Sequence, residues 1–470
     1  MPKRPNILFI MSDDHAAHAM GCYGSRINET PNMDRIAAGG MRLDNCFCTN
    51  SICTPSRAVI LTGTYNHVNG VTTLSTPMDN RLQTFPKLLQ AAGYQTAVIG
   101  KWHLGIGPQH CPTGFDYWNV LPGQGLYHDP EMIEMAPSGE RTVFKGYVTD
   151  LITDMSIDWI RRRDRDRPFC LLCHHKAPHR HWEPDAKHAH LYDDVEIPEP
   201  ETFNDDYANR AAAAEAATMR IDRDLNEDDV KGSPPEGLSP RDVKKWKYQR
   251  YIKDYLRVVA SMDDGIGRLL DTLDDEGLTD DTVVIYTSDQ GFFLGDHGWY
   301  DKRFMYEESL RMPFIIRYPR QIAPGTANAD MVLNLDFPPT LLGYAGVPIP
   351  GAMQGTSIRP LLGGHTPDGW RTAMYYRYWM HKAHHNVYAH YGLRTLRHKL
   401  IYYYGEACGQ DGAIDEPTEP EWELFDLQRD PCELNNVYHD PAYADVVTEL
   451  KSELHRLQAD VGDEPMPEIE

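Results

Sequence analysis

Acidic and amide side chains follow two apolar stretches of the sequence. Asp13 and Asp14 come after NILFIM, and Asp289 and Gln290 come after TVVIYTS. Because chemistry in open parallel sheets collects beyond the carboxyl ends of the strands, we expect these four side chains to lie together. Three carboxylates in one place raise one another's pKa unless a cation compensates them. An all-oxygen set of ligands favours calcium, with magnesium as the alternative.

Cationic side chains follow two further apolar stretches. Lys101 and His103 come after QTAVIG, and His179 comes after CLLCHHKAP. At the same edge of the sheet they would be partners for a bound oxyanion. Taken singly, each is equally compatible with a surface cluster, because the chain contains 21 histidines. Likewise, a single Asp-Asp pair is compatible with a helix cap or a solvated turn.

Cys53 lies in the segment NSICTPSRAVILTG, residues 50–63, where an apolar run predicts a helix. A thiol at a helix N-terminus, one turn from Arg57, is expected to have a lowered pKa and to be nucleophilic. A soft thiolate is nevertheless an unfavourable neighbour for a hard, oxygen-bound cation. The predicted metal site therefore requires an oxygen nucleophile, which an unmodified Cys53 does not supply.

The residues Cys53-Thr54-Pro55-Ser56-Arg57 resemble the C-x-P-S-R signature of type I sulfatases, a formylglycine-dependent family of the alkaline-phosphatase-like superfamily. The resemblance covers nearly the whole chain and includes PNILFIMSDDH, GYQTAVIGKWHLG, HKAPH, TSDQG, KRFMYEESLRMP and ELFDLQRDPCELNNV. It implies that a formylglycine-generating maturase converts Cys53 to Cα-formylglycine (3-oxoalanine). The hydrated aldehyde would supply the oxygen nucleophile.

The resemblance also implies a role for each matching residue. The expected cation ligands are Asp13, Asp14, Asp289, Gln290 and position 53. Gln290 replaces the asparagine of many members and keeps the carbonyl oxygen. Arg57 and Lys101 would hold and activate the two hydroxyls of the hydrated aldehyde. His103 would be the base that later takes a proton from the second hydroxyl, so that sulfate is expelled and the aldehyde re-forms. His179 and Lys302 would bind the sulfate and assist the leaving group. His175 and Lys176 do not match the motif and are left out.

Segments outside this centre resemble the N-acetylglucosamine-6-sulfatases, in HHKAPHRHWEP, DQGFFLGDHGWYDKR, HYGLRT and EWELFDL. The expected reaction is removal of a 6-O-sulfate from terminal N-acetylglucosamine of mucin O-glycans or heparan-type glycans. Asp296 and His297 are expected to bind the hydroxyls at positions 3 and 4 of that sugar. A second cluster is expected to close the pocket, with a solvated linker as the alternative; it comprises His384, His385, His390 and Arg394.

Other functions remain open at this point. A different sulfated sugar is one alternative, either galactose-6-sulfate, N-acetylgalactosamine-6-sulfate or a 2-O-sulfated uronate. A phosphonate monoester or phosphodiester hydrolase on the same scaffold is a second. A non-catalytic binding protein that kept the fold is a third.

Alternating apolar runs and helical patterns must position these residues. The strands are expected at 6–11, 95–99, 168–173, 281–287 and 313–318, and the helices at 31–38, 56–61, 84–92, 148–161 and 244–274. This alternation predicts an α/β fold, with a large, mostly parallel sheet sandwiched by helices. Residues 1–365 would form the catalytic domain, with an acidic, Pro-rich surface excursion at 183–243. Residues 366–470 would form a smaller α+β domain ending in a frayed tail.

Composition limits the partners. The net charge of −23 opposes binding to nucleic acid or to anionic surfaces. The sequence lacks an apolar stretch long enough to span a membrane. No signal peptide is visible, which favours a cytoplasmic location, with a longer natural chain as the alternative. Nine cysteines form no evident disulfide framework. The oligomeric state is not readable from the sequence.

Overall fold

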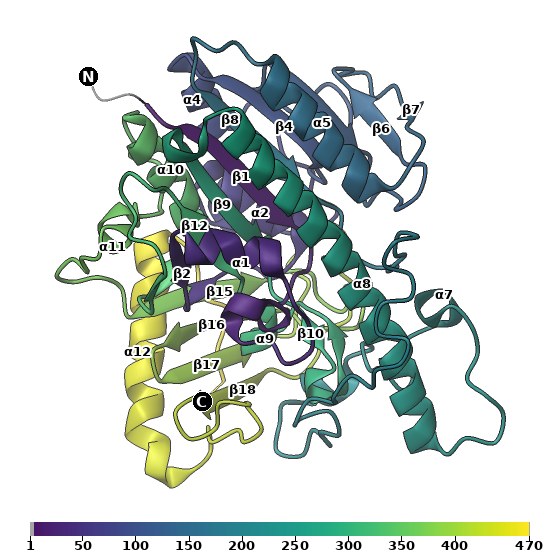
Figure 1. The fold of residues 1–470 in the computed structure, drawn as a ribbon. Coiled ribbons are helices and arrows are strands. Elements are labelled where there is room, and N and C mark those ends of the chain that lie inside the picture. The colour runs from purple at the N-terminus through teal and green to yellow at the C-terminus, as the bar shows by residue number, and fades with distance from the viewer. Residues whose placement is uncertain (1–3, 470) are drawn as a thin grey trace.

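The computed structural model describes residues 4–469, in which ten strands form one large sheet (Figure 1). Their order is β13-β2-β12-β9-β1-β8-β4-β5-β6-β7. Five neighbouring strands in the middle are mutually parallel: β9 (Thr282–Ser288), β1 (Asn6–Ser12), β8 (Phe169–His174), β4 (Gln95–Lys101) and β5 (Tyr117–Leu121). Almost every residue of these strands is buried, as their near-continuous apolar sequences predict.

The flanks of the sheet are mixed. They consist of β12 (Phe314–Arg317), β2 (Met41–Leu43) and β13 (Thr326–Asn328) on one side, and β6 (Glu131–Glu134) and β7 (Thr142–Val143) on the other. β12 was expected to be parallel but pairs antiparallel with β9. The connection between them holds a small hairpin, β10 (Phe293–Leu294) and β11 (Tyr300–Asp301), a 3-10 turn at Asp296–Gly298 and the four-residue helix α9 (Glu307–Leu310). Without a crossover helix of ordinary length, the chain returns alongside β9 in the opposite direction.

Helices cover both faces of the sheet, so the predicted sandwich is confirmed (Figure 1). One layer contains α1 (Pro31–Ala38), α5 (Val148–Arg162) and the long α8 (Pro240–Asp275), and the other contains α2 (Cys53–Thr62), α4 (Phe85–Ala91) and α10 (Phe337–Ala345). The side chain of Ser239 caps α8 by accepting a hydrogen bond from the Asp242 amide. Among the described helices, none is long and apolar enough to cross a membrane.

A smaller antiparallel sheet follows near the C-terminus, with the strands β15 (Ala373–Tyr378), β16 (His390–Thr395), β17 (His398–Tyr403) and β18 (Glu421–Asp426). Helix α12 (Ala444–Val461) packs along it, shown in yellow in Figure 1. The following residues were expected to fray, which is wrong for 463–469. Asp463 pairs with Arg377 at 2.8 Å, and the Tyr402 hydroxyl donates to the Pro467 carbonyl.

The segment 183–243 is more than a surface excursion. It contains α6 (Ala212–Ala216), α7 (Glu227–Val230) and the start of α8, and Ala213 and Ala214 are fully buried. The Thr218 amide donates to the His385 carbonyl at 2.7 Å, and the Ala211 amide donates to Glu423 at 2.8 Å. The Met219 carbonyl accepts from the Tyr300 amide of β11 at 2.9 Å, so the segment connects the β10–β11 hairpin to the small sheet.

The remaining elements are short. Besides short 3-10 turns, they are the helices α3 (Asn66–Asn69) and α11 (Arg359–Leu362), and the paired strands β3 (Cys46–Phe47) and β14 (Val332–Leu333).

Candidate active site

The register of β1 and β9 brings three carboxylates together. Ser12 pairs with Ser288, so Asp13 and Asp14 leave the sheet beside Asp289. The carboxylate oxygens of these three residues lie within 4.8 Å of one another, and all three side chains are buried. The hydroxyl of Tyr255, from α8, donates to the Asp14 carbonyl at 2.8 Å and accepts from the Ala16 amide, which holds the left-handed backbone of Asp14 in place.

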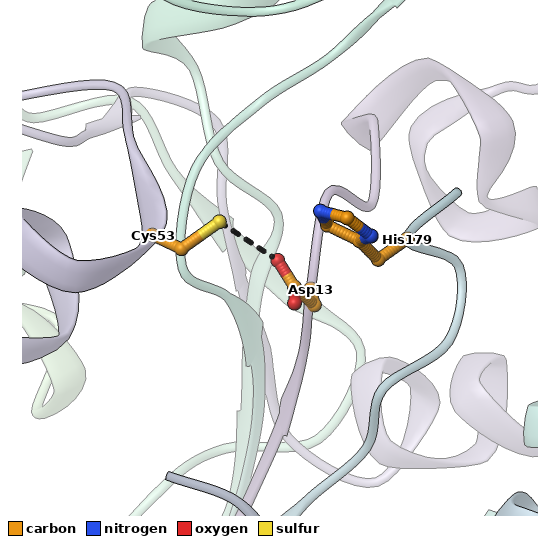
Figure 2. Close-up of side chains that lie close together, drawn as sticks. All are labelled: Asp13, Cys53 and His179. Carbon is orange, nitrogen blue, oxygen red and sulfur yellow. Dashed lines mark hydrogen bonds between the residues drawn. The ribbon is translucent and has the colours of Figure 1, made fainter. Parts of the chain in front are cut away.

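Cys53 is the first residue of α2, and its side chain points at this cluster. Its Sγ donates a hydrogen bond to Asp13 at 3.3 Å, and Figure 2 shows the imidazole of His179 close to the same carboxylate. Burial raises the pKa of the Cys53 thiol to about 12, with Lys302 opposing the shift and the Asp14 carboxylate adding to it. The expectation of a lowered pKa was therefore wrong, because burial outweighs the charges of Lys302 and Arg57.

Each carboxylate contacts a cation from another segment. Lys302 Nζ lies 2.6 Å from Asp14, Arg57 Nε lies 2.9 Å from Asp289, and Lys101 Nζ contacts Asp13. Burial raises the pKa of Asp14 to about 6, and the pairing with Lys302 limits that rise. Although burial opposes the charged form of Lys302, the carboxylates of Asp14 and Asp301 raise its pKa. Lys302 is therefore an ammonium group at neutral pH.

Two histidines complete the centre. His103 follows β4 with a left-handed backbone, and its carbonyl accepts from the Thr54 hydroxyl at 2.8 Å. His179 follows β8, and its Nε2 lies 3.9 Å from Asp14. Burial, followed by the charge of Lys101, lowers the pKa of both imidazoles well below the ordinary value. Beside His103 opens an apolar cavity of about 330 Å³, lined by Trp102, Trp118 and neighbours.

Sequence reasoning missed Asp301 and Arg303 and set Lys176 aside, although all three lie around this centre. Asp301 lies at the end of β11, beside Lys302, and its carboxylate lies 3.3 Å from His385 Nε2 and 3.3 Å from Arg303 Nε. Lys176 is buried with its Nζ over the ring of Tyr127, and burial lowers its pKa to about 8. The segment DKR around Lys302 was a usable signal for Asp301 and Arg303, because three successive charges follow an apolar hairpin. For Lys176 the signal was its place after β8, and it was set aside only because it does not match the family motif.

The predicted sugar-binding residues divide into two groups. His384 and His385 lie near Asp301, at the centre. His297 is fully buried, with Nδ1 2.8 Å from Asp205, so it has no surface to offer a sugar. Asp296 pairs with His18 and lines surface cavities whose residues include none of the catalytic set.

His390 and Arg394 are also corrected by the structure. His390 is fully buried among tyrosine rings of the small sheet, and its Nδ1 donates to the Tyr388 carbonyl. Arg394 binds Glu307 through two nitrogens at 3.0 and 3.1 Å. His390 therefore packs inside the small sheet, and Arg394 links that sheet to α9.

The sulfatase family model matches residues 5–347, and the model of the C-terminal part of N-sulphoglucosamine sulphohydrolase matches residues 295–460. The chain belongs to the sulfatase family.

Curated relatives of this sulfatase act on different substrates. An N-acetylglucosamine-6-O-sulfatase of Bacteroides thetaiotaomicron is 44% identical, over 100% of this chain and 88% of the relative. An arylsulfatase of Clostridium perfringens is 28% identical over 95% of this chain and 93% of its own. The human N-acetylgalactosamine-6-sulfatase is 29% identical over 80% of this chain and 69% of its own.

Solved structures share the fold. A protein in complex with its substrate D-glucosamine-2-N,6-O-disulfate superposes with a TM-score of 0.90 at 43% identity, covering 98% of both chains. The phosphonate monoester hydrolase of Agrobacterium radiobacter reaches a TM-score of 0.76 at 21% identity, covering 97% of this chain and 96% of its own. At that identity the second likeness concerns the fold alone.

The sulfatase's donor set fits a divalent cation. The ligand atoms of Asp13, Asp14 and Asp289 are hard oxygens, which calcium and magnesium prefer. Gln290 directs its amide nitrogen to Asp14 and to Cys53, and its Oε1 is buried without a hydrogen bond to any described residue. A turn of the amide by half a rotation would place that oxygen at the cluster as a ligand. A cation beside three buried carboxylates would offset the cost of burying their charge.

Proposed function

We propose that this sulfatase removes the 6-O-sulfate from a terminal N-acetylglucosamine of sulfated glycans, after conversion of Cys53 to formylglycine. One observation carries the proposal: the side chain at position 53 opens α2 and contacts Asp13 inside a cluster of three carboxylates. The position of the nucleophile therefore lies against the proposed metal site, and the side chains of Arg57, Lys101 and Lys302 contact the same carboxylates.

The environment of Cys53 supports its conversion. With a pKa near 12, the thiol is protonated at neutral pH and is a poor nucleophile. Formylglycine in its hydrated form supplies two hydroxyl groups at the same position. The proposal includes a maturase that converts Cys53 to formylglycine.

The surrounding residues of the chain have distinct tasks. Arg57 and Lys101 lie where they can bind the hydroxyls at position 53 and the sulfate oxygens. His103, neutral at pH 7, can accept a proton from the second hydroxyl. Lys302, charged at pH 7, can donate a hydrogen bond to the oxygen that leaves with the sugar. His179 faces the same region. The sulfate anion, once bound, favours the imidazolium form, in which Nδ1 donates to the Arg180 carbonyl and Nε2 would share that task.

A divalent cation would be held by Asp13, Asp14, Asp289, Gln290 and position 53. When bound, it supplies positive charge to the sulfate oxygens and favours the attack of an oxygen nucleophile. We favour calcium over magnesium, because carboxylates from two different strand ends can provide the six to eight oxygens that calcium accepts.

The proposed sugar specificity depends on a second set of residues. Asp301, Arg303 and His385 form a charged group next to Lys302, in which Asp301 and Arg303 are buried and His385 is partly buried. A polar group of this kind discriminates between hydroxyl epimers, because a wrong epimer leaves a buried charge unpaired. The relative at 44% identity is named for the same sugar sulfate. These observations favour N-acetylglucosamine over galacto-configured sugars.

A substrate panel tests the proposal. The matured enzyme is incubated with N-acetylglucosamine-6-sulfate, N-acetylgalactosamine-6-sulfate, galactose-6-sulfate, N-acetylglucosamine-3-sulfate and an aryl phosphonate monoester, and released sulfate or alcohol is quantified. We expect kcat/KM to be highest for the first. Preference for a galacto-configured sugar would overturn the sugar assignment, and preference for the phosphonate would overturn the reaction class. Mass spectrometry of the peptide around Cys53 checks the conversion independently.

A further inference from the structure

A buried carboxylate in the 183–243 segment binds the residues that follow His179. Asp229 is fully buried in the first turn of α7. It accepts hydrogen bonds from Arg180 through Nε at 3.1 Å and Nη2 at 2.5 Å, and it binds His181 Nδ1 at 2.9 Å. A carboxylate that makes this fork to an arginine fixes both the position and the plane of the guanidinium. Asp229 thereby fixes the chain at residues 180 and 181.

The backbone carbonyl of Arg180 is the link to the catalytic centre. It accepts from His179 Nδ1 at 2.6 Å and from Lys176 Nζ at 3.2 Å. Because a carbonyl oxygen accepts hydrogen bonds and cannot donate them, Nδ1 of His179 carries a hydrogen. The other ring nitrogen, Nε2, is consequently turned to the carboxylate of Asp14. The position of one carbonyl sets which nitrogen faces the reacting groups.

The two sides of this short segment are held by different parts of the molecule. On the N-terminal side, the Ala177 carbonyl accepts from the Asp13 amide, and the His179 carbonyl accepts from the Tyr127 hydroxyl at 2.7 Å. On the C-terminal side, Asp229 anchors the segment through Arg180 and His181. Loss of the Asp229 charge would free the Arg180 carbonyl without disturbing the carboxylate cluster.

We propose that Asp229 is a positioning residue of this sulfatase: it holds the Arg180 carbonyl that orients His179 toward the leaving oxygen. The inference rests on the proposed role of His179 in the reaction. It assigns a task to the 183–243 segment, because α7 of that segment places Asp229 against residues 180 and 181.

A double-mutant cycle tests the proposal. We measure kcat and KM for wild type, Asp229→Asn, His179→Gln and the double variant, on whichever sulfate ester of the panel is hydrolysed fastest. Asp229→Asn should lower kcat by roughly 10- to 100-fold, the usual effect of losing a partner that orients an active-site group, and change KM little. If Asp229 acts through His179, the double variant should be no slower than His179→Gln.

Leaving-group dependence gives a second measurement. An aryl sulfate such as 4-nitrophenyl sulfate needs less assistance at the leaving oxygen than a sugar sulfate does. Asp229→Asn and His179→Gln should therefore both slow the sugar sulfate more than the aryl sulfate. Should Asp229→Asn fail to fold, Arg180→Lys, which keeps the charge but loses the fork, should give the same selective loss.

Asp205 provides a matched control in the same segment. Its carboxylate binds Arg210 and His297 Nδ1, the same pair of partner types, but contacts no residue of 176–181 in the described chain. Asp205→Asn should leave the ratio of sugar to aryl rates unchanged. Multiplicative losses in the double variant, or equal losses on both esters, would overturn the inference. A His179→Gln variant with unimpaired kcat would instead refute the proposed role of His179 itself.

Discussion

Lys302 Nζ and the carboxylate of Asp14 are 2.6 Å apart, with both side chains almost completely buried. The same carboxylate is a proposed cation ligand, and the same ammonium group is a proposed donor to the leaving oxygen. Asp14 therefore serves two partners, and its charge helps to keep Lys302 protonated. The cation site and the leaving-group site are coupled through one residue.

Substitution of Asp14 should disturb both sites at once. We expect Asp14→Asn to weaken calcium binding, measured by titration calorimetry, and to lower kcat/KM by more than about 100-fold, because a ligand and the partner of Lys302 are lost together. The control is Asp254→Asn. It removes a buried carboxylate of α8 that pairs with Lys231, at the end of α7, and with Arg257 of α8. If Asp14→Asn kept wild-type calcium affinity, the assigned ligand set would be wrong.

Removal of the cation should abolish turnover reversibly. After treatment with a calcium chelator and desalting, we expect loss of activity and recovery on adding calcium, with weaker recovery on adding magnesium. Elemental analysis of active enzyme should find calcium in stoichiometric amount. Stoichiometric zinc or iron that is needed for activity would contradict the assignment to an oxygen-bound hard cation.

Substitutions of Cys53 should separate chemistry from folding. Cys53→Ala is expected to eliminate turnover while leaving the thermal midpoint within a few degrees of wild type, because one small buried side chain contributes little to a core of this size. Cys53→Ser should be nearly inactive, since a serine provides a single hydroxyl. Sustained multiple turnovers by Cys53→Ser would argue against the need for two hydroxyls at this position.

The sugar assignment can be tested with a pair of neighbouring carboxylates. Asp301→Asn should reduce kcat/KM for N-acetylglucosamine-6-sulfate by about 10-fold or more and weaken the preference over the galacto epimer. Asp296→Asn should have little effect, because Asp296 pairs with His18 away from the centre. The opposite result would restore the sequence-based expectation for Asp296.

Glu433 provides a pH test of stability. Burial raises its pKa from 4.5 to about 7 in the folded chain, with Lys399 opposing the shift. Between these two values the folded state binds more protons than the unfolded state, so the stability that Glu433 contributes is present at acidic pH and lost as the pH rises through 7. Glu433→Gln should therefore show a smaller fall in thermal midpoint between pH 5 and pH 8 than wild type. Parallel profiles for the two proteins would contradict the raised pKa.

Much of the fold was predictable, because buried parallel strands have continuous apolar sequences. The strands that deliver Asp13, Lys101, His179 and Asp289 were each located to within a residue or two. The direction of β12 was not predictable from its own residues, since strand direction depends on the connection before it. The raised pKa of Cys53 was also missed, because the depth of burial depends on residues distant in sequence.

The sugar-binding residues show a second limit. Asp296 and His297 follow the metal-bearing loop closely in sequence, yet the β10–β11 hairpin turns them away and presents Asp301 instead. Two residues in a hairpin point to opposite sides or opposite ends, so proximity in sequence is a poor guide. The prediction for His390 was wrong for a related reason, because a histidine in a tyrosine-rich strand can be a core residue as easily as a ligand.

The contacts of the 183–243 segment have a thermodynamic consequence. It binds the loop of the β10–β11 hairpin through Asp205 and the small sheet through the Glu423 carboxylate. Opening the small sheet would therefore expose buried ionic partners on both sides of the junction, which is costly. We expect the large and small sheets to melt in one cooperative calorimetric transition, so that a chain cut at residue 365 would not yield two independently stable halves.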